Sequence, residues 1–239
     1  MWRLKYSIIV NIPKLYYILE SMHRMADRQD LYSEQETYDY VREKLVGLLN
    51  KSAHIRTECY GTENLPEEGG YVLYPNHQGV YDGCSIITAH EKALTGTMER
   101  EASYTLILDD MVKALRGKRL DLQEKNQVQE VMEAVTEEVK QGRRYCIFPE
   151  GGYNDEKRNT LWEFNPVCFE AAVKAGAPIV PVALVDSYKV CNSGTVLPVK
   201  PQVHFLKPLC WEEYRDMDNA KIAAEVKGRI QQKLTEAVR

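Results

Sequence analysis

A histidine and an aspartate stand five positions apart, at His77 and Asp82, directly after an apolar run. In a turn that leads from a strand into a helix, this spacing lets the carboxylate reach one imidazole nitrogen and hold the ring in one tautomer. The other ring nitrogen can then accept a proton from a hydroxyl group, which is general-base chemistry. The pair therefore has the base and the orienting acid of a triad, without a nucleophilic side chain. The structural alternative is a histidine that closes the turn by bonding to the aspartate.

A glycine turn ends a second apolar run, where Glu150, Gly151 and Gly152 follow the segment 147–149. Backbone N–H groups of such a turn can face an anion or a polar head group, and Glu150 can accept hydrogen bonds from hydroxyl groups. A plain loop at the end of a strand is the structural alternative. A third run, residues 178–183, contains two prolines and indicates a core strand. Ligands of open α/β sheets bind beyond the carboxyl ends of the strands, so we expect the first two motifs to converge there.

The elements that must position these motifs alternate between strand and helix. This alternation predicts an α/β fold, with a mostly parallel mixed sheet flanked by helices. Strands are predicted at 54–60, 71–74, 145–148, 178–185 and 201–206, with further short strands between 94 and 104 and at 118–122. Helices are predicted at 34–50, 84–94, 104–116, 124–141, 163–175 and 216–238.

The N-terminal segment, residues 1–28, has an amphipathic helical pattern that Pro13 is expected to kink or interrupt. It carries five basic and two acidic side chains, a local charge of +3. Such a helix suits a membrane interface, but a helix that packs its apolar stripe on the rest of the domain has the same pattern. The segment has no signal-peptide pattern, and the chain contains no run of 18 apolar residues. The apolar stripe consists of Trp2, Tyr6, Ile9, Ile12, Tyr16 and Leu19.

The composition excludes some classes of protein. The chain has 239 residues, with 31 basic and 35 acidic side chains and a formal net charge of -4. A nucleic-acid-binding protein usually has a basic excess, so no nucleic-acid partner is expected. The six cysteines include no CxxC pair, which is neither zinc-ligand spacing nor a dense disulfide framework. We therefore expect a reducing, cytosolic environment and no metal.

Taken together and in this order, the three motifs resemble the glycerolipid acyltransferase family. The resemblance covers about residues 55–207 and includes the segment 61–66 ahead of the first motif. Its specific part is Asn76-His77-x4-Asp82, with Phe148-Pro149-Glu150-Gly151 about seventy residues later and a Val-Pro-Val strand beyond. The resemblance implies an α/β acyltransferase domain over residues 53–239. An N-terminal two-helix membrane-associating segment would precede it, over residues 1–52.

The resemblance also implies roles and partners. His77 would be the general base and Asp82 would orient it, while a lipid hydroxyl attacks the thioester of acyl-CoA or acyl carrier protein. The acceptor would be a lysophospholipid, most simply 1-acyl-glycerol-3-phosphate. Neither cofactor nor metal is implied, and the expected location is the cytoplasmic face of a membrane, held peripherally through residues 1–28. Substrate binding is implied for Asn76, Glu150, Gly151 and Gly152, with backbone amides at the glycines as candidate donors to an oxyanion or a phosphate.

Two departures from the family pattern concern the acceptor. The family usually has an arginine six residues after a glycine between the main motifs; here the glycine is Gly117 and the matching position is Gln123. The second motif usually ends Thr-Arg, and here it reads Gly152-Tyr153. Arg119 is one cation that could substitute, so Arg119 and Gln123 are both candidate substrate-binding residues. Another lysophospholipid, a glycolipid or another hydroxylated amphiphile therefore competes with lysophosphatidate as the acceptor.

Two further functions remain as alternatives. A thioesterase would use His77 to activate water instead of a lipid hydroxyl. A non-catalytic lipid-binding or membrane-scaffold protein would keep the fold alone, and the intact His77, Asp82 and Glu150 argue against it.

Overall fold

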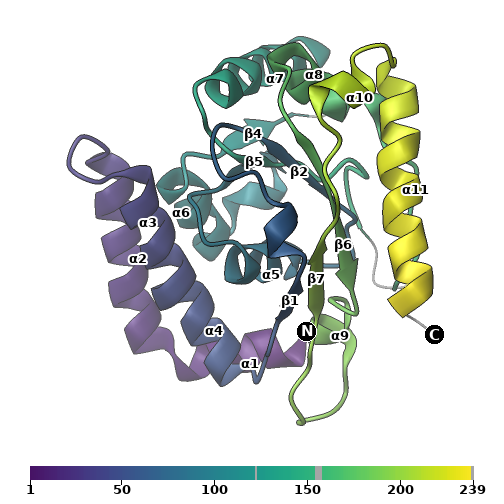
Figure 1. Cartoon of the computed structure of the whole chain (residues 1–239). Coiled ribbons are helices and arrows are strands. Elements are labelled where there is room, and N and C mark those ends of the chain that lie inside the picture. The colour runs from purple at the N-terminus through teal and green to yellow at the C-terminus, as the bar shows by residue number, and fades with distance from the viewer. Residues whose placement is uncertain (122, 154–157, 238–239) are drawn as a thin grey trace.

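The computed structural model describes residues 1–121, 123–153 and 158–237. Within these residues one seven-stranded sheet has the order β1-β7-β6-β2-β5-β3-β4. Only β6 and β7 pair antiparallel among the described strands, which confirms the mostly parallel mixed sheet (Figure 1). The strands are β1 (Glu58–Tyr60), β2 (Val72–Pro75), β3 (Thr95–Glu99), β4 (Lys118–Leu120), β5 (Tyr145–Cys146), β6 (Ile179–Val185) and β7 (Gln202–Phe205).

Helices cover both faces of the sheet, as alternate residues of β2 illustrate. Val72 and Tyr74 share one core with side chains of α7, α8 and α11. Leu73 shares the other core with side chains of α2, α3, α5 and α6. The helices are α1 (Trp2–Val10), α2 (Ile12–Asp27), α3 (Glu34–Tyr40), the π-helix η1 (Val41–Val46), α4 (Gly47–Ser52), α5 (Asp82–Ala89), α6 (Leu106–Ala114), α7 (Lys125–Lys140), α8 (Glu170–Ala175), α9 (Lys189–Asn192), α10 (Trp211–Tyr214) and α11 (Asn219–Ala237). Short 3₁₀ helices are η2 (Thr62–Asn64), η3 (Ala102–Tyr104) and η4 (Pro166–Phe169).

Several predicted boundaries were wrong, for local reasons. The strand predicted from residue 54 begins at Glu58, because His54 has a left-handed backbone with φ of +53°. The helix predicted from residue 163 begins at Pro166, where the Asn165 side chain accepts the N–H of Val167 and caps a 3₁₀ turn. β4 ends at Leu120, so Gln123 lies beyond the strand.

The N-terminal helices expose the apolar stripe predicted from the sequence. The helix breaks at Asn11, and Pro13 lies in the first turn of α2, as expected. The opposite face is the buried one, with Arg3 and Ser7 on α1 and Leu15 and Met22 on α2. No helix among the described residues is both long enough and apolar enough to cross a bilayer. Five of the six stripe residues are exposed, namely Trp2, Tyr6, Ile9, Ile12 and Tyr16.

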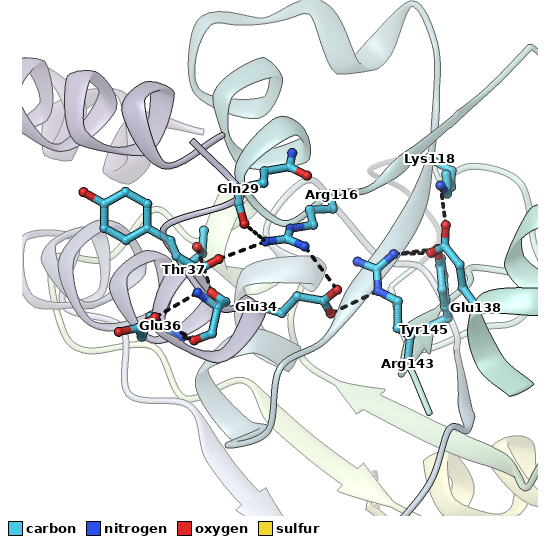
Figure 2. Close-up of polar contacts among 11 residues, drawn as sticks. Gln29, Glu34, Glu36, Thr37, Arg116, Lys118, Glu138, Arg143 and Tyr145 are labelled. Atoms are coloured by element: carbon cyan, nitrogen blue, oxygen red, sulfur yellow. Dashed lines mark hydrogen bonds and ion pairs between the residues drawn. The ribbon is translucent and has the colours of Figure 1, made fainter. Parts of the chain in front are cut away.

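An ion-pair network attaches the N-terminal helices to the sheet (Figure 2). Glu34, the first residue of α3, accepts a hydrogen bond from Nε of Arg143 at 3.0 Å and pairs with Arg116 at 3.6 Å. Arg116 also donates to the main-chain carbonyl of Tyr32 at 3.0 Å. On its other side, Arg143 pairs with Glu138 of α7. These contacts fix α3 against the turn before β4 and the start of β5. The boundary between residues 52 and 53 stays a prediction from the sequence.

A buried histidine makes the stability of this fold dependent on pH. His90 is fully buried; its Nδ1–H donates to the carbonyl of Lys92 at 2.7 Å, and its Nε2 accepts the Tyr71 hydroxyl at 2.6 Å. The bond from Tyr71 requires an unprotonated Nε2 and therefore the neutral ring. Burial lowers the pKa of His90 to about 4, while the bond to Lys92 acts in the opposite direction. Between this value and the unfolded value near 6.5, the unfolded chain binds more protons.

We therefore expect the free energy of unfolding to decrease by about 3 kcal/mol as the pH falls from about 6.5 to about 4. Urea unfolding at a series of pH values measures this. His90→Gln keeps an acceptor for Tyr71 but does not titrate, so its curve should be flatter in this range. A curve as steep as that of the wild type would exclude His90 as the cause. Some slope should remain in the variant, because burial also lowers the pKa of His204 to about 4.

Candidate active site

The loop between β2 and α5 brings His77 and Asp82 together. β2 ends at Pro75, and Asp82 is the first residue of α5. His77 Nδ1 lies 2.8 Å from Oδ2 of Asp82. Asp82 is fully buried, whereas the side chain of His77 is 18% exposed. The predicted pairing of an oriented imidazole with a buried carboxylate is therefore present at the carboxyl end of a central strand.

The carboxylate of Asp82 is fixed by its own loop. Oδ2 also accepts the backbone N–H of Gln78 and that of Gly79, the latter at 2.9 Å. Oδ1 is buried and has no hydrogen-bond partner within the described part of the chain. Three N–H donors therefore converge on one oxygen, and they hold the carboxylate in place beside the imidazole.

Two aromatic rings flank His77. The Phe148 ring centroid lies 4.2 Å from that of the imidazole, and the Tyr153 centroid lies 4.6 Å from it. Both come from the second motif, so the strand ends converge as expected. The rings restrict the imidazole and lower the polarity around it, which strengthens its interaction with Asp82. The sequence predicted neither ring contact, although Phe148 and Tyr153 flank the predicted site residues of the second motif.

Glu150 braces the two motifs against each other. Its Oε1 accepts the backbone N–H of His77 at 2.8 Å, and its Oε2 accepts that of Trp162 at 2.7 Å. Gly151 follows with φ of +68°, a conformation that favours glycine, and its N–H donates to the Phe148 carbonyl. Gly151 is exposed and Gly152 half-buried beside this brace. The carboxylate thus binds main-chain donors here, and its predicted contact with the acceptor stays a prediction.

Asn76 is bonded to β6 through its side chain, and its predicted contact with substrate stays a prediction. It is fully buried, and its amide both donates to the carbonyl of Leu184 and accepts the N–H of the same residue. These two bonds hold the end of β2 against β6. Its role in the geometry is therefore to align the strand that carries His77.

Gln78 is a site residue that the sequence did not reveal. It is buried, and its amide N–H group donates to the carbonyl of Leu184 and to Oδ1 of Asn159. Its side-chain oxygen accepts the hydroxyl of Ser187. These partners lie 81 to 109 positions away along the chain, so no local spacing could have indicated them.

Arg119 and Gln123 lie apart from the His77 loop. They belong to β4 and the turn after it, and two strands separate β4 from β2, a distance of roughly 14 Å. The Arg119 guanidinium donates to Asp109 at 2.6 Å and to the Ser103 hydroxyl at 2.8 Å. Gln123 is exposed. The structure therefore does not bring these two predicted residues together with the base.

An apolar cavity of about 100 Å³ lies beside the site. It is enclosed by α5, α6 and the strands β3 and β5. Phe148 forms part of its wall and also contacts the ring of His77, so the cavity begins next to the imidazole. The other lining residues include Gly83, Ile86, Ile87, Leu94, Met98, Met111, Val112, Leu115 and Cys146.

Metal-ligating side chains do not gather in the residues that the structure describes: no three His, Cys, Asp or Glu side chains are placed to share an ion. All six cysteines lie within the described ranges and are unbridged.

Comparisons with known proteins identify the family and the fold. The sequence matches the Acyltransferase family over residues 56–185, more than half of the chain. It is 27% identical over 191 residues to the 1-acyl-sn-glycerol-3-phosphate acyltransferase of Salmonella typhimurium, covering 76% of this chain and 74% of that protein. A chloroplastic enzyme of the same name from Brassica napus, BAT2, is 26% identical over 145 residues, which span 59% of this chain and only 40% of that protein. The crystal structure of PlsC, the 1-acyl-sn-glycerophosphate acyltransferase of Thermotoga maritima, has the same fold. Its TM-score is 0.72 at 20% identity, covering 99% of this chain and 95% of that chain.

Proposed function

Since this chain belongs to the acyltransferase family, we propose that it moves a fatty acyl group from acyl-CoA or acyl carrier protein to the hydroxyl of a lysophospholipid. The first candidate acceptor is 1-acyl-glycerol-3-phosphate, which would give phosphatidate; the Salmonella and Brassica relatives are named for this acceptor. The observation that carries the proposal is the 2.8 Å contact between His77 Nδ1 and the buried carboxylate of Asp82.

The chemistry follows from that contact. Because Nδ1–H is donated to Asp82, the basic lone pair of the neutral ring lies on Nε2. Nε2 takes the proton of the acceptor hydroxyl as its oxygen attacks the thioester carbonyl. The tetrahedral intermediate collapses by breaking the C–S bond, and the thiolate recovers the proton from the imidazolium. No acyl-enzyme forms, and the chemistry requires neither metal nor cofactor. Of the two predicted backbone donors, the Gly151 N–H is already bonded to the Phe148 carbonyl. The Gly152 N–H is therefore the candidate donor to the oxyanion, and Glu150 fixes its loop.

The apolar cavity supplies a place for an acyl chain. Its wall consists mainly of aliphatic and methionine side chains, and Phe148 connects it to the imidazole. An acyl chain bound there would hold the carbonyl or the acceptor near His77, and exclusion of water would favour transfer over hydrolysis.

Filling the cavity is expected to shift the preferred acyl length. Gly83 lines the cavity, and a Cβ added there meets no atom within 4 Å, so Gly83→Leu should be accommodated. We expect the ratio of kcat/KM for palmitoyl over octanoyl donors or acceptors to fall about tenfold, because the longer chain loses apolar contacts. The matched control is Gly228→Leu on the exposed face of α11, where a Cβ also meets no atom within 4 Å. An unchanged ratio in Gly83→Leu would remove the acyl chain from this cavity.

A membrane surface is the proposed partner of residues 1–28. The exposed stripe on α1 and α2, together with the local positive charge, suits the interface of an anionic bilayer. We place the enzyme peripherally on the cytoplasmic face, where its thioester donors would be available; the six unbridged cysteines agree with a reducing compartment.

A different acceptor is the second candidate, because three cations that could replace the missing motif arginines are already paired. Arg116 pairs with Glu34, Lys118 with Glu138, and Arg119 with Asp109. Each of these cations already faces a carboxylate, which weakens its attraction for a phosphate monoester. Lys157, another basic residue near the second motif, lies outside the described residues.

A panel of acceptors tests the proposal. Purified protein is incubated with palmitoyl-CoA and, separately, lysophosphatidate, lysophosphatidylcholine, lysophosphatidylglycerol or monoacylglycerol, while thiol release and product mass are followed. Acylated lysophosphatidate is the expected main product. Transfer only to the other acceptors would establish the second candidate. Thiol release without a lipid product would indicate a thioesterase, and no reaction with bound lipid would indicate a lipid-binding protein.

A further inference from the structure

The connection between α9 and β7 presents two aliphatic side chains to solvent. Val196 is 71% exposed and Leu197 is 68% exposed, which places them among the most exposed apolar side chains of the described residues. Figure 1 shows this connection and α1 at the same end of the molecule. Exposure of one aliphatic residue is ordinary, but an adjacent pair at a loop tip beside an apolar helix calls for an explanation.

α1 holds the backbone of this loop through a buried arginine. Arg3 is only 2% exposed, and its guanidinium donates to the carbonyls of Thr195 and Leu197 and, at 3.0 Å, to that of Ala53. The neighbouring indole N–H of Trp2 donates to the carbonyl of Ser193 at 2.9 Å. Three loop carbonyls therefore face α1, and the hydrogen bonds fix the loop. The backbone of the loop tip therefore has a fixed position in the fold. Its apolar side chains stay exposed although this backbone is held.

The two segments also share a charge pattern. Residues 1–19 and 187–201 contain no Asp or Glu. Lys5 and Lys14 are exposed among the apolar residues of the first segment. α9 carries Lys189, which pairs with Asp186, and the loop carries Lys200, which pairs with Glu58. An apolar tip next to an acid-free helix with exposed lysines complements the anionic surface of a bilayer.

The same end of the molecule leads directly to the active site. Tyr81, which precedes Asp82, packs in one apolar cluster with Val190 of α9 and Val199, against which Leu4 of α1 lies. Gln78 accepts the hydroxyl of Ser187, just before α9. These contacts link α1 and α9 to the loop that carries His77. A bilayer that contacted both α1 and the loop tip would therefore lie on the side of the protein where that link begins.

We propose that Val196 and Leu197 form a second membrane-insertion point, held in register with α1 by Arg3 and Trp2. The proposal rests on the membrane association proposed above and extends it from residues 1–28 to a loop at the far end of the sequence. Two contacts separated along the surface would fix the orientation of the enzyme on the bilayer, whereas one helical stripe leaves rotation about its axis free.

Vesicle sedimentation with three double variants of the full chain tests this. The vesicles contain phosphatidylcholine with a minor fraction of phosphatidylglycerol. Val196→Ser with Leu197→Ser removes the tip, and Ile9→Ser with Ile12→Ser removes part of the stripe. Leu31→Ser with Met217→Ser is the matched control. These two residues are exposed apolar side chains in the α2–α3 turn and the α10–α11 link, at the opposite end of the molecule (Figure 1). Unchanged circular dichroism and Tm establish that each variant is folded.

We expect the tip variant to lower the partition coefficient about tenfold and the control variant to leave it unchanged. If only the stripe variant loses binding, the loop proposal is overturned while the membrane role of residues 1–28 stands. If only the tip variant loses binding, the loop proposal stands and the role of the stripe is overturned. A wild-type chain that does not sediment with these vesicles would overturn both.

Discussion

Replacement of His77 by glutamine is expected to lower kcat/KM for acyl transfer by at least about 10³-fold. Glutamine can still donate an N–H to Asp82 and fills a similar volume, but it cannot accept a proton from the acceptor hydroxyl. The 2.8 Å bond to Asp82 and the flanking rings of Phe148 and Tyr153 position this imidazole for such a role. The measurement is thiol release from palmitoyl-CoA with the acceptor identified by the panel.

The matched control is His204→Gln. His204 is also mostly buried and lies on β7, where it stacks on Tyr60 at the edge of the sheet. This variant should retain activity. That result would show that replacing a mostly buried histidine does not by itself abolish acyl transfer. Added imidazole should restore part of the activity of His77→Ala, because it can occupy the vacated space as a base. Full activity in a folded His77→Gln enzyme would refute the assignment of the general base.

The sequence predicted the residues of the two motifs better than it predicted the residues that hold these motifs in place. His77 and Asp82 are close in the chain, so their contact depends on one loop and could be inferred from spacing. The strand–helix alternation likewise depends on local periodicity, and it predicted the mostly parallel sheet. The brace of Glu150 on the backbone of His77 joins motifs 73 positions apart. Composition and spacing contain no information about such a contact, and the family resemblance suggested a substrate role instead.

Arg3 is a further residue whose structural role could not be predicted from the sequence pattern. In the sequence it is one of five basic residues among an apolar stripe, and nothing in that pattern distinguishes it from the other four. In the structure it is buried against carbonyls of residues 53, 195 and 197. Amphipathic periodicity identified the exposed stripe correctly but could not identify which basic side chain the far loop would require. The end of β4 was equally hard to locate by pattern, and Gln123 lies beyond it. The predicted acceptor contacts of Arg119 and Gln123 stay predictions.

Asp82→Asn is expected to lower kcat about 10³-fold while changing KM less than about threefold. Asparagine keeps the volume of a fully buried side chain and an oxygen that can accept the N–H groups of His77, Gln78 and Gly79. What it removes is the negative charge, which matters only when the imidazole becomes an imidazolium during proton transfer. In the proposed mechanism Asp82 acts through His77 and does not touch the substrate. It is then a positioning residue, and substrate affinity should be nearly unaffected.

A double-mutant cycle distinguishes this role from a structural one. If Asp82 acts only by orienting His77 and stabilising its charged form, then Asp82→Asn in the His77→Gln background should have little further effect on kcat/KM. If Asp82 mainly holds the loop that leads into α5, the two losses should multiply, and the Tm of Asp82→Asn should fall with its activity. The three N–H donors that converge on one carboxylate oxygen would serve either role, so the cycle measures what the geometry contributes to catalysis. Strong non-additivity with an unchanged Tm is the result we expect.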